Sequence, residues 1–367
     1  LLAFGVVSPN SIPINVVTTP LIVIVSLGAF ISAVAGLVVP IVGSALAWAL
    51  YWPSHWLMQI VQLTLQLPGN GIATGRITLW QLLMLYGLLC LVWWQSSYEH
   101  QPQTVNYRRL FRLPMAALLG IAIVLGCSLV MLPAWYTAAQ LVRATVMATP
   151  NESVLVWQER GKVGIIGDPS PKTVDFAVVP FLQAQGINRL HWALALNPMA
   201  ATSGWSAIAA RFPIASLYHA SSLASIPNIP ALQQISWHSL TTTNPVQLGS
   251  ITIRPVITEP LVLTLQLGST LWLWLGGLSH AQQVQLATAN NLPTAQVVWW
   301  SGDALAGALL KRVQPKWAIA TAPQLHPDTR DRLRKRHIQL FWLTRDGAIQ
   351  WKPTGFTLSS TEAESQL

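Results

Sequence analysis

Long apolar runs fill the first third of the chain, whereas shorter ones alternate with polar residues in the rest. Four runs have about the 20 residues that a helix needs to cross a bilayer, namely Val16–Val38, Pro40–Leu67, Ile77–Trp94 and Leu113–Tyr136. We predict a membrane-spanning helix from each, with a turn at residues 67–71. Pro53 interrupts the second run and three glutamines follow it, so this run predicts either a bent span or a short span followed by an interfacial helix.

From about Gln140 onward the apolar runs have the length of strands and are separated by turn residues. We predict strands at Ser153–Trp157, Val163–Ile166, Leu190–Leu196, Ile214–Tyr218, Ile251–Val256, Leu261–Leu267, Thr270–Leu275, Gln296–Trp300, Lys316–Ala320, Gln339–Leu343 and Ala348–Trp351. Helical spacing predicts helices at Val174–Gln185, Gly204–Arg211, Ser279–Asn290, Asp303–Val313 and Asp328–Arg336. Strands that first form hairpins and later alternate with helices favour an α/β or layered α+β domain.

The sequence therefore predicts three parts: membrane helices over residues 1–137, a soluble domain over 138–353 and a disordered tail over 354–367, which is rich in Ser, Thr and Glu. The chain opens at Leu1 inside apolar sequence, with no basic segment before it. We therefore expect a fragment that begins inside a larger membrane domain, because a signal peptide starts with positive charge.

Charge supports the membrane assignment of the first part. Only 9% of the 367 residues are charged, against roughly a quarter in soluble proteins, and none occurs before Arg76. This pattern excludes a small soluble domain, a disordered chain and a disulfide-rich secreted module. The net charge of +9 favours polyanions or anionic lipid as partners.

The loop between the third and fourth apolar runs predicts the orientation of the chain. It carries Arg108, Arg109 and Arg112 against the single acidic residue Glu99. Because an excess of Lys and Arg marks cytoplasmic loops, the fourth span runs outward. We therefore expect the soluble domain to lie outside the cytoplasm.

Motifs that carry chemistry are missing from the sequence. It has no His-x-His, no His-Glu-x-x-His, no paired cysteines, no glycine-rich phosphate loop and no Gly-x-Ser-x-Gly. Eight histidines are scattered without ligand spacing, and Cys90 and Cys127 lie inside apolar runs. The sequence alone therefore names no nucleophile, no metal site and no cofactor.

Several stretches nevertheless occur in the order and at the intervals of a known family. They are Phe4–Pro9 with Asn15 and Pro20 in the membrane part, and Val154–Val156, Val179–Leu190, Leu310–Ala320, His326-Pro327 and Thr344–Ile349 in the soluble part. This layout resembles the ComEC family of competence DNA-uptake channels over essentially the whole chain. The resemblance implies a membrane α-helical bundle followed by an α/β soluble domain of the αββα, metallo-β-lactamase-like type.

The chain departs from this family where nuclease-type members hold metal. Their Gly-Gln-Gly-Asp and Asp-Thr-Gly turns correspond here to Thr149–Glu152 and Ile166–Pro169. Their His-Pro-x-x-Asp-His-x-Gly-Gly loop corresponds to Asn197–Trp205, and their Thr-Gly-Asp and His-His-Gly-Ser turns correspond to Gly276–Leu278 and Trp299–Gly302. Only Asp168 and His326 remain as candidate remnants. Since the substituted residues cannot hold an ion that activates water, we expect a retained fold with no catalytic residues, no metal and no cofactor.

The resemblance thus implies a component of an inner-membrane channel that passes single-stranded DNA into the cytoplasm during natural transformation, with a non-catalytic extracytoplasmic domain. A membrane-tethered nuclease and a small-solute transporter or scaffold stay open as alternatives. The expected partners are single-stranded DNA, the lipid bilayer and other competence proteins, and assembly as a homo-oligomer stays open.

Two groups of side chains are candidates for contact with nucleic acid. The basic helix supplies cations for sequence-independent phosphate contacts, or is a solvated face offset by Asp328 and Asp331; its cations are Arg330, Arg332, Arg334, Lys335 and Arg336. Tryptophans stack on bases or fill cores; the candidates are Trp272, Trp274, Trp299 and Trp300. Because Trp299 and Trp300 are adjacent in a predicted strand, at most one of the two is a platform.

Overall fold

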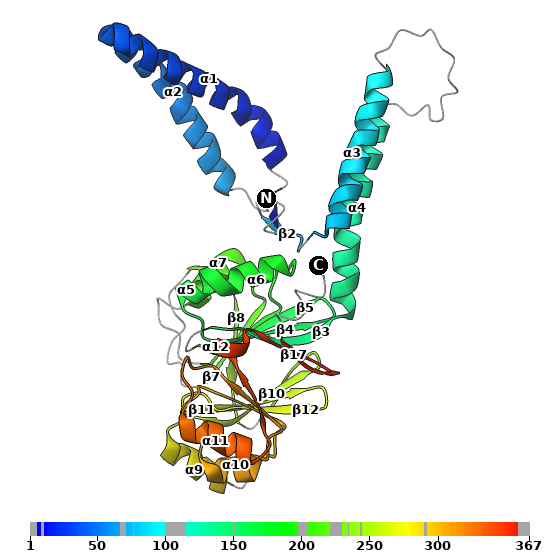
Figure 1. Ribbon diagram of the computed structural model, residues 1–367, viewed down its shortest axis with the longest axis vertical. Coiled ribbons are helices and arrows are strands. Elements are labelled where there is room, and N and C mark those ends of the chain that lie inside the picture. The colour runs from blue at the N-terminus through cyan, green and yellow to red at the C-terminus, as the bar shows by residue number, and fades with distance from the viewer. Residues whose placement is uncertain are drawn as a thin grey trace, which may run out of the picture. The chain divides into compact units, whose positions relative to one another are not determined.

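The structure is a computed structural model that describes residues 6–8, 11–66, 71–75, 77–99, 115–149, 152–196, 204–220, 230–233, 235–242, 244–289 and 292–358. Two compact units divide the chain (Figure 1). One comprises Leu1–Leu82 with Gln183–Gly186, and the other Leu83–Leu182 with Ile187–Leu367. The predicted turn at 67–71 and the basic loop with Arg108, Arg109 and Arg112 lie wholly or mostly outside the described residues.

The first unit is a helical hairpin of α1 (Ser11–Val38) and α2 (Pro40–Gln66), with the two-stranded sheet of β1 (Val6–Val7) and β2 (Ile72–Ala73). Only Val39 separates the helices. They come together at small residues: a Cβ on Gly43 would lie 2.4 Å from the Cα of Gly36. The Ser32 hydroxyl donates a 2.7 Å hydrogen bond to the carbonyl of Gly43. Contact at glycines lets two helix backbones approach closely, as in membrane helix pairs.

The second unit begins at Leu83, within α3 (Leu79–Glu99), and continues with α4 (Met115–Gln140), which runs beside α3 in Figure 1. All four predicted apolar runs are therefore helices, and α2 continues through Pro53 as one helix. Among the described residues, two helices are long and apolar enough to cross a membrane, Ile14–Val38 and Leu119–Gln140. Large apolar side chains point outward from all four helices, and Cys90 and Cys127 are exposed and free. Water does not favour such a surface, whereas lipid does.

Two sheets form the remainder of the second unit. The first has the strand order β17-β16-β3-β4-β5-β6-β7-β8. Its strands are β3 (Val142–Val146), β4 (Val154–Glu159), β5 (Lys162–Gly167), β6 (Trp192–Ala195), β7 (Ser216–Ala220), β8 (Ser236–Leu240), β16 (Ile349–Lys352) and β17 (Gly355–Leu358). Neighbours pair antiparallel from β17 to β5 and parallel from β5 to β8. Parallel neighbours need helical crossovers, which this half of the sheet has.

The second sheet has the order β15-β14-β13-β12-β11-β10-β9. Its strands are β9 (Val246–Leu248), β10 (Ile251–Thr258), β11 (Leu261–Leu267), β12 (Thr270–Trp274), β13 (Val297–Trp300), β14 (Trp317–Ala320) and β15 (Gln339–Trp342). The strands from β9 to β12 pair antiparallel, and those from β12 to β15 pair parallel. Meander strands thus precede a βαβ-type half in each sheet.

Three hydrophobic clusters define the layers. The central cluster joins the sheets, with Trp157 and Trp351 from the first and Trp272 and Trp299 from the second. The first sheet's other face packs against the π-helix Val174–Val178, which follows the short helix α5 (Pro171–Thr173), and against α6 (Val179–Ala184), α7 (Gly204–Arg211) and α8 (Pro230–Gln233). The second sheet's other face packs against α9 (His280–Thr288), α10 (Gly307–Val313) and α11 (Pro327–Lys335). This αββα order confirms the fold class expected from the sequence.

The structure adds elements that the hydrophobic pattern did not predict. Strands β3, β8, β9 and β17 are all short, and three of them carry polar or half-exposed residues. The predicted disordered tail is wrong at its start, because Gly355–Leu358 pairs with β16 and Phe356 packs 5.1 Å from Phe341 between ring centroids. Residues 359–367 lie outside the described chain.

Candidate functional site

Within each sheet, the carboxyl ends of two neighbouring parallel strands lie beside each other, and the segments that follow these strands correspond in sequence to the metal site of the family that the chain resembles. These segments follow β5, β6, β12 and β13. Residues 197–203, which replace most of the metal loop, lie outside the described chain, but both residues that flank them are described. Leu196, which precedes this segment, is 2% exposed, and Gly204 and Trp205, which follow it at the start of α7, are buried, with Trp205 0% exposed.

Tryptophan side chains fill the interior beside these segments. Trp274 at the end of β12 and Trp299 in β13 are 4% and 0% exposed. Their rings make an edge-to-face contact with centroids 6.4 Å apart. Gly276, with φ +58°, allows the chain to turn over the Trp274 ring, since a Cβ there would lie 3.0 Å from it. This part of the domain is therefore packed with apolar rings, which offer no ligand to a metal ion.

Polar groups near this edge stabilise loops. One carboxylate oxygen of Glu152 accepts a 3.0 Å hydrogen bond from the backbone N–H of Ser170, so this residue of the former Gly-Gln-Gly-Asp turn fastens the loop after β5. In the loop after β13, Ser301 donates to the carboxylate of Asp303, and the Trp300 indole N–H donates to the Asp303 carbonyl. Bonds of this kind position the backbone of the two loops.

The two candidate metal remnants do not form a cluster. Asp168 follows β5, and His326 precedes α11 with its backbone N–H bonded to the Gly302 carbonyl. In the described part of the chain, no group of three or more His, Cys, Asp and Glu side chains is arranged to hold a metal ion. The residues present therefore do not fit the metal that the family's fold implies.

The tryptophans proposed as stacking platforms belong to the core. Trp272, Trp299 and Trp300 are at most 1% exposed, and Trp274 is 4% exposed. Trp299 faces the other sheet and Trp300 faces the helices, as expected for adjacent strand residues. Neither presents a face to a base, so the core interpretation is correct for all four.

The cations of the basic helix α11 fall into two groups, those bonded to backbone carbonyls of the domain and those that are exposed. Arg332 donates a 2.7 Å hydrogen bond to the Leu305 carbonyl, and Arg336 donates a 3.4 Å bond to the Gly307 carbonyl. These two side chains connect α11 to the start of α10. In contrast, Arg330, Arg334 and Lys335 are exposed, and no ion pair within the described chain involves this helix.

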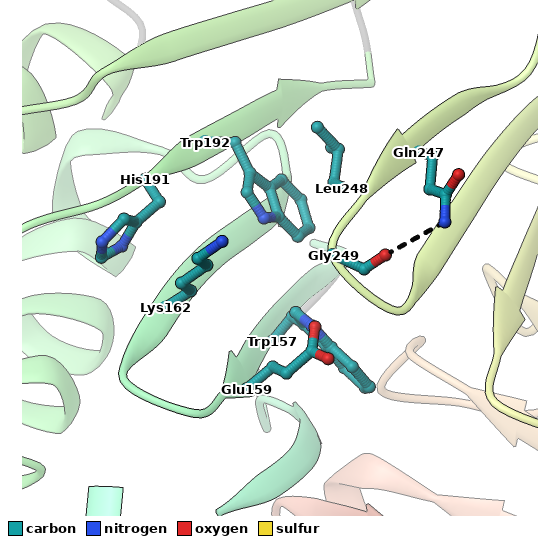
Figure 2. A pocket seen from close by; sticks show the side chains of 8 residues that line it. All are labelled: Trp157, Glu159, Lys162, His191, Trp192, Gln247, Leu248 and Gly249. Carbon is teal, nitrogen blue, oxygen red and sulfur yellow. Dashed lines mark hydrogen bonds between the residues drawn. The ribbon is translucent and has the colours of Figure 1, made fainter. Parts of the chain in front are cut away.

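A small pocket of about 230 Å³ lies at the ends of several strands, between the β4–β5 and β9–β10 turns (Figure 2). Figure 2 shows Lys162 extending toward the Trp192 indole and Glu159 beside Trp157. The remaining lining residues are His191, Gln247, Leu248 and Gly249. One carboxylate oxygen of Glu159 accepts a 2.8 Å hydrogen bond from the Ser250 N–H, which connects the two sheets at the pocket rim.

His191 is the titratable group that this environment alters. Burial lowers the pKa of its imidazole, and the nearby charges of Arg189 and Lys162 lower it further. Its Nδ1 accepts a 3.1 Å hydrogen bond from the Val163 N–H, so in the neutral ring Nε2 carries the proton. Sequence reasoning missed this pocket because its residues come from three distant segments; the turns at 159–162 and 247–249 were the available signal.

Comparison with known proteins gives a family match for the N-terminal part of the chain and similar solved structures that cover just over half of it. Residues 1–98 match the family described as Competence protein. No curated protein matches the chain. Similar solved structures include the metallo-β-lactamase fold protein YhfI from Bacillus subtilis, 10% identical with a TM-score of 0.35, covering 57% of this chain and 99% of that one. Zn²⁺-bound PqqB from Methylobacterium extorquens is 9% identical with a TM-score of 0.38, covering 55% and 86%.

Proposed function

We propose, from the match of residues 1–98 to the family described as Competence protein, that the chain is a component of an inner-membrane channel that passes single-stranded DNA into the cytoplasm during natural transformation. The family match over α1, α2 and most of α3 is the observation that carries the proposal. The outward-facing apolar side chains of α1–α4 support a multi-pass membrane position. Other competence proteins, and further copies of this chain, are the partners proposed for assembly.

We further propose that the αββα domain is non-catalytic. Trp299 stands where nuclease-type members of the resembled family carry a histidine, and its buried ring packs against that of Trp274. Glu152 accepts a hydrogen bond from the Ser170 backbone. The domain therefore contributes a folded scaffold to the channel, without bond cleavage of its own.

The domain is proposed to lie outside the cytoplasm. Arg108, Arg109 and Arg112, between α3 and α4 in the sequence, outweigh Glu99 at the end of α3, and α4 then leads into β3 through Leu141 alone. A tag at the C-terminus should be accessible to protease in intact spheroplasts. Protection of that tag until the membrane is lysed would overturn this orientation.

Two measurements test the function itself. Deletion of the gene should abolish transformation by added DNA while DNA binding at the cell surface persists, and complementation should restore it. Undiminished transformation excludes the channel proposal. Purified full chain should bind neither zinc nor manganese stoichiometrically and should leave labelled single-stranded DNA uncut; metal-dependent cutting favours the membrane-tethered nuclease instead.

A further inference from the structure

The positive charge of the chain is concentrated on the helical layer outside the second sheet. Residues 275–338 hold eight Lys and Arg residues against three Asp residues, a net of +5 out of the chain's +9. Helices α9, α10 and α11 in this segment cover one face of the sheet (Figure 1). Such a concentration creates a local positive potential that attracts anions to this layer.

Helix α11 presents the most exposed part of this charge. Arg330 and Arg334 are four residues apart and therefore share a helix face, with Lys335 beside them. Asp328 and Asp331 lie on the same helix, but no ion pair joins them to these cations in the described structure. We call Arg330, Arg334 and Lys335 the α11 cation group.

The α11 cation group is held on a rigid support. Leu333 and Thr329 are buried at 1% and 0% exposure, and the Thr329 hydroxyl accepts a 2.9 Å hydrogen bond from the Leu305 N–H. Arg332 and Arg336 bind the backbone at Leu305 and Gly307. The helix therefore presents its free cations in fixed positions, which lowers the entropic cost of binding.

The surface is better suited to nucleic-acid phosphates than to a bilayer. A helix that lies on lipid inserts an apolar face, but the apolar residue inside α11, Leu333, is in the domain core. Among the described residues of 275–338, the only large apolar side chain that is exposed is Val284 on α9, at 39%. Cations without an insertable apolar face fit a hydrated phosphate backbone.

We infer that Arg330, Arg334 and Lys335 form a sequence-independent contact surface for the phosphates of DNA, whereas Arg332 and Arg336 are structural. This inference rests on the proposed function. It reduces the DNA-contacting residues that the sequence predicts in this helix from five cations to three. Phosphate contacts carry no sequence information, and the candidate stacking residues Trp272, Trp274, Trp299 and Trp300 are buried, so oligothymidylate and oligoadenylate should bind nearly equally.

The test uses the full chain in nanodiscs of zwitterionic lipid and a labelled oligothymidylate, with affinity measured by fluorescence anisotropy over a series of salt concentrations. The triple variant Arg330→Gln, Arg334→Gln and Lys335→Gln should reduce the salt slope by about 2 and the affinity at 0.1 M salt by roughly 100-fold. Its matched control removes three exposed cations elsewhere, Lys172→Gln, Arg189→Gln and Arg254→Gln, and should change both quantities little. Equal losses in the two triple variants overturn the inference.

Two further variants separate binding from folding. Arg330→Lys with Arg334→Lys keeps the charges and should keep the salt slope. Arg332→Gln removes a donor to the Leu305 carbonyl and should lower the melting temperature while leaving the slope nearly unchanged. A slope that falls as much in Arg332→Gln as in the triple variant contradicts the division of tasks.

The remaining outcomes distinguish lipid binding and the fate of the proposed function. If the triple variant loses affinity for phosphatidylglycerol vesicles but keeps its affinity for DNA, the surface binds lipid headgroups and the inference is wrong. If the variant loses DNA binding while deletion of the gene leaves transformation intact, the surface assignment stands and the channel function is the proposal that fails.

Discussion

Gly164 in β5 lies directly beneath the indole of Trp192 in β6, so closely that a Cβ on Gly164 would come within 2.0 Å of the ring. Gly164 pairs with Trp157 on one side and with Trp192 on the other. The glycine thus leaves room for the Trp192 ring to lie over β5, next to Trp157 on the neighbouring strand β4. These two rings form one wall of the pocket in Figure 2.

Substitution of Gly164 by Ala should therefore destabilise the domain by about 3 kcal/mol, the upper part of the range for overpacking. Chemical denaturation of the chain in detergent would measure the change. The double variant Gly164→Ala with Trp192→Val should recover part of the loss, because the smaller side chain removes the collision. If the losses in stability of the two single variants simply add up in the double variant, a Cβ at position 164 does not collide with the Trp192 ring.

The contact between α1 and α2 gives a prediction for the membrane part. Gly43→Val should loosen the hairpin, since even a Cβ at this position would lie 2.4 Å from the Cα of Gly36, and the Ser32 bond to the Gly43 carbonyl would be strained. The melting temperature in nanodiscs should fall. Gly87→Val and Gly120→Val are matched controls, because a Cβ at either position meets nothing within 4 Å.

The hydrophobic pattern alone was enough to predict α1 to α4 and most core strands. Long apolar runs mark the four helices, and short apolar runs between turn residues mark the strands. Leu261–Leu267 is a strand with the bounds that the sequence predicts, and Gly204–Arg211 is the predicted helix. The pattern missed β8, where Ser236, His238 and Ser239 are exposed at the sheet edge and give no apolar signal. It also missed β17, whose Phe356 is recognisable as structured only once Trp272 and Phe341 are known to lie against it.

The site was less accessible to sequence reasoning than the fold. That Asn197–Trp205 contains no His, Asp or Glu could be read directly from the sequence. The different tasks of Arg332 and Arg334 could not, because they depend on where the Leu305 carbonyl lies, 27 residues away from Arg332. The role of a cation on a helix depends on which group its side chain contacts in the folded domain. The charge pattern of the sequence does not contain that information.

Trp299 tests the interpretation of the former metal site as core. Trp299→Ala should cost about 3–5 kcal/mol, because it opens a large cavity between the sheets. Trp299→Phe should cost much less, since the Trp299 indole nitrogen is buried and has no hydrogen-bond partner among the described residues, so its removal breaks none of their bonds. Denaturation curves of both variants give the comparison. Equal destabilisation by the two changes would contradict a purely packing role.

The lowered pKa of His191 leads to a prediction of how the stability of the folded chain depends on pH. Burial, Arg189 and Lys162 lower the pKa of its imidazole in the folded chain below the ordinary value of 6.5. Between that lowered value and 6.5 the unfolded chain binds the proton and the folded chain does not. Stability is therefore complete above pH 6.5 and falls as the pH drops through 6.5 toward the lowered pKa, below which it stops changing.

His191→Asn removes this titration and keeps an acceptor for the Val163 N–H, so its melting temperature should fall less over the same pH range than that of the unmodified chain. Lys162→Gln removes one of the charges that disfavour the protonated ring, and should therefore give an intermediate pH dependence. Melting curves recorded by intrinsic fluorescence at several pH values provide the measurement. If His191→Asn and the unmodified chain lose stability in parallel, the proton taken up on unfolding binds another group, and the pocket does not hold His191 neutral.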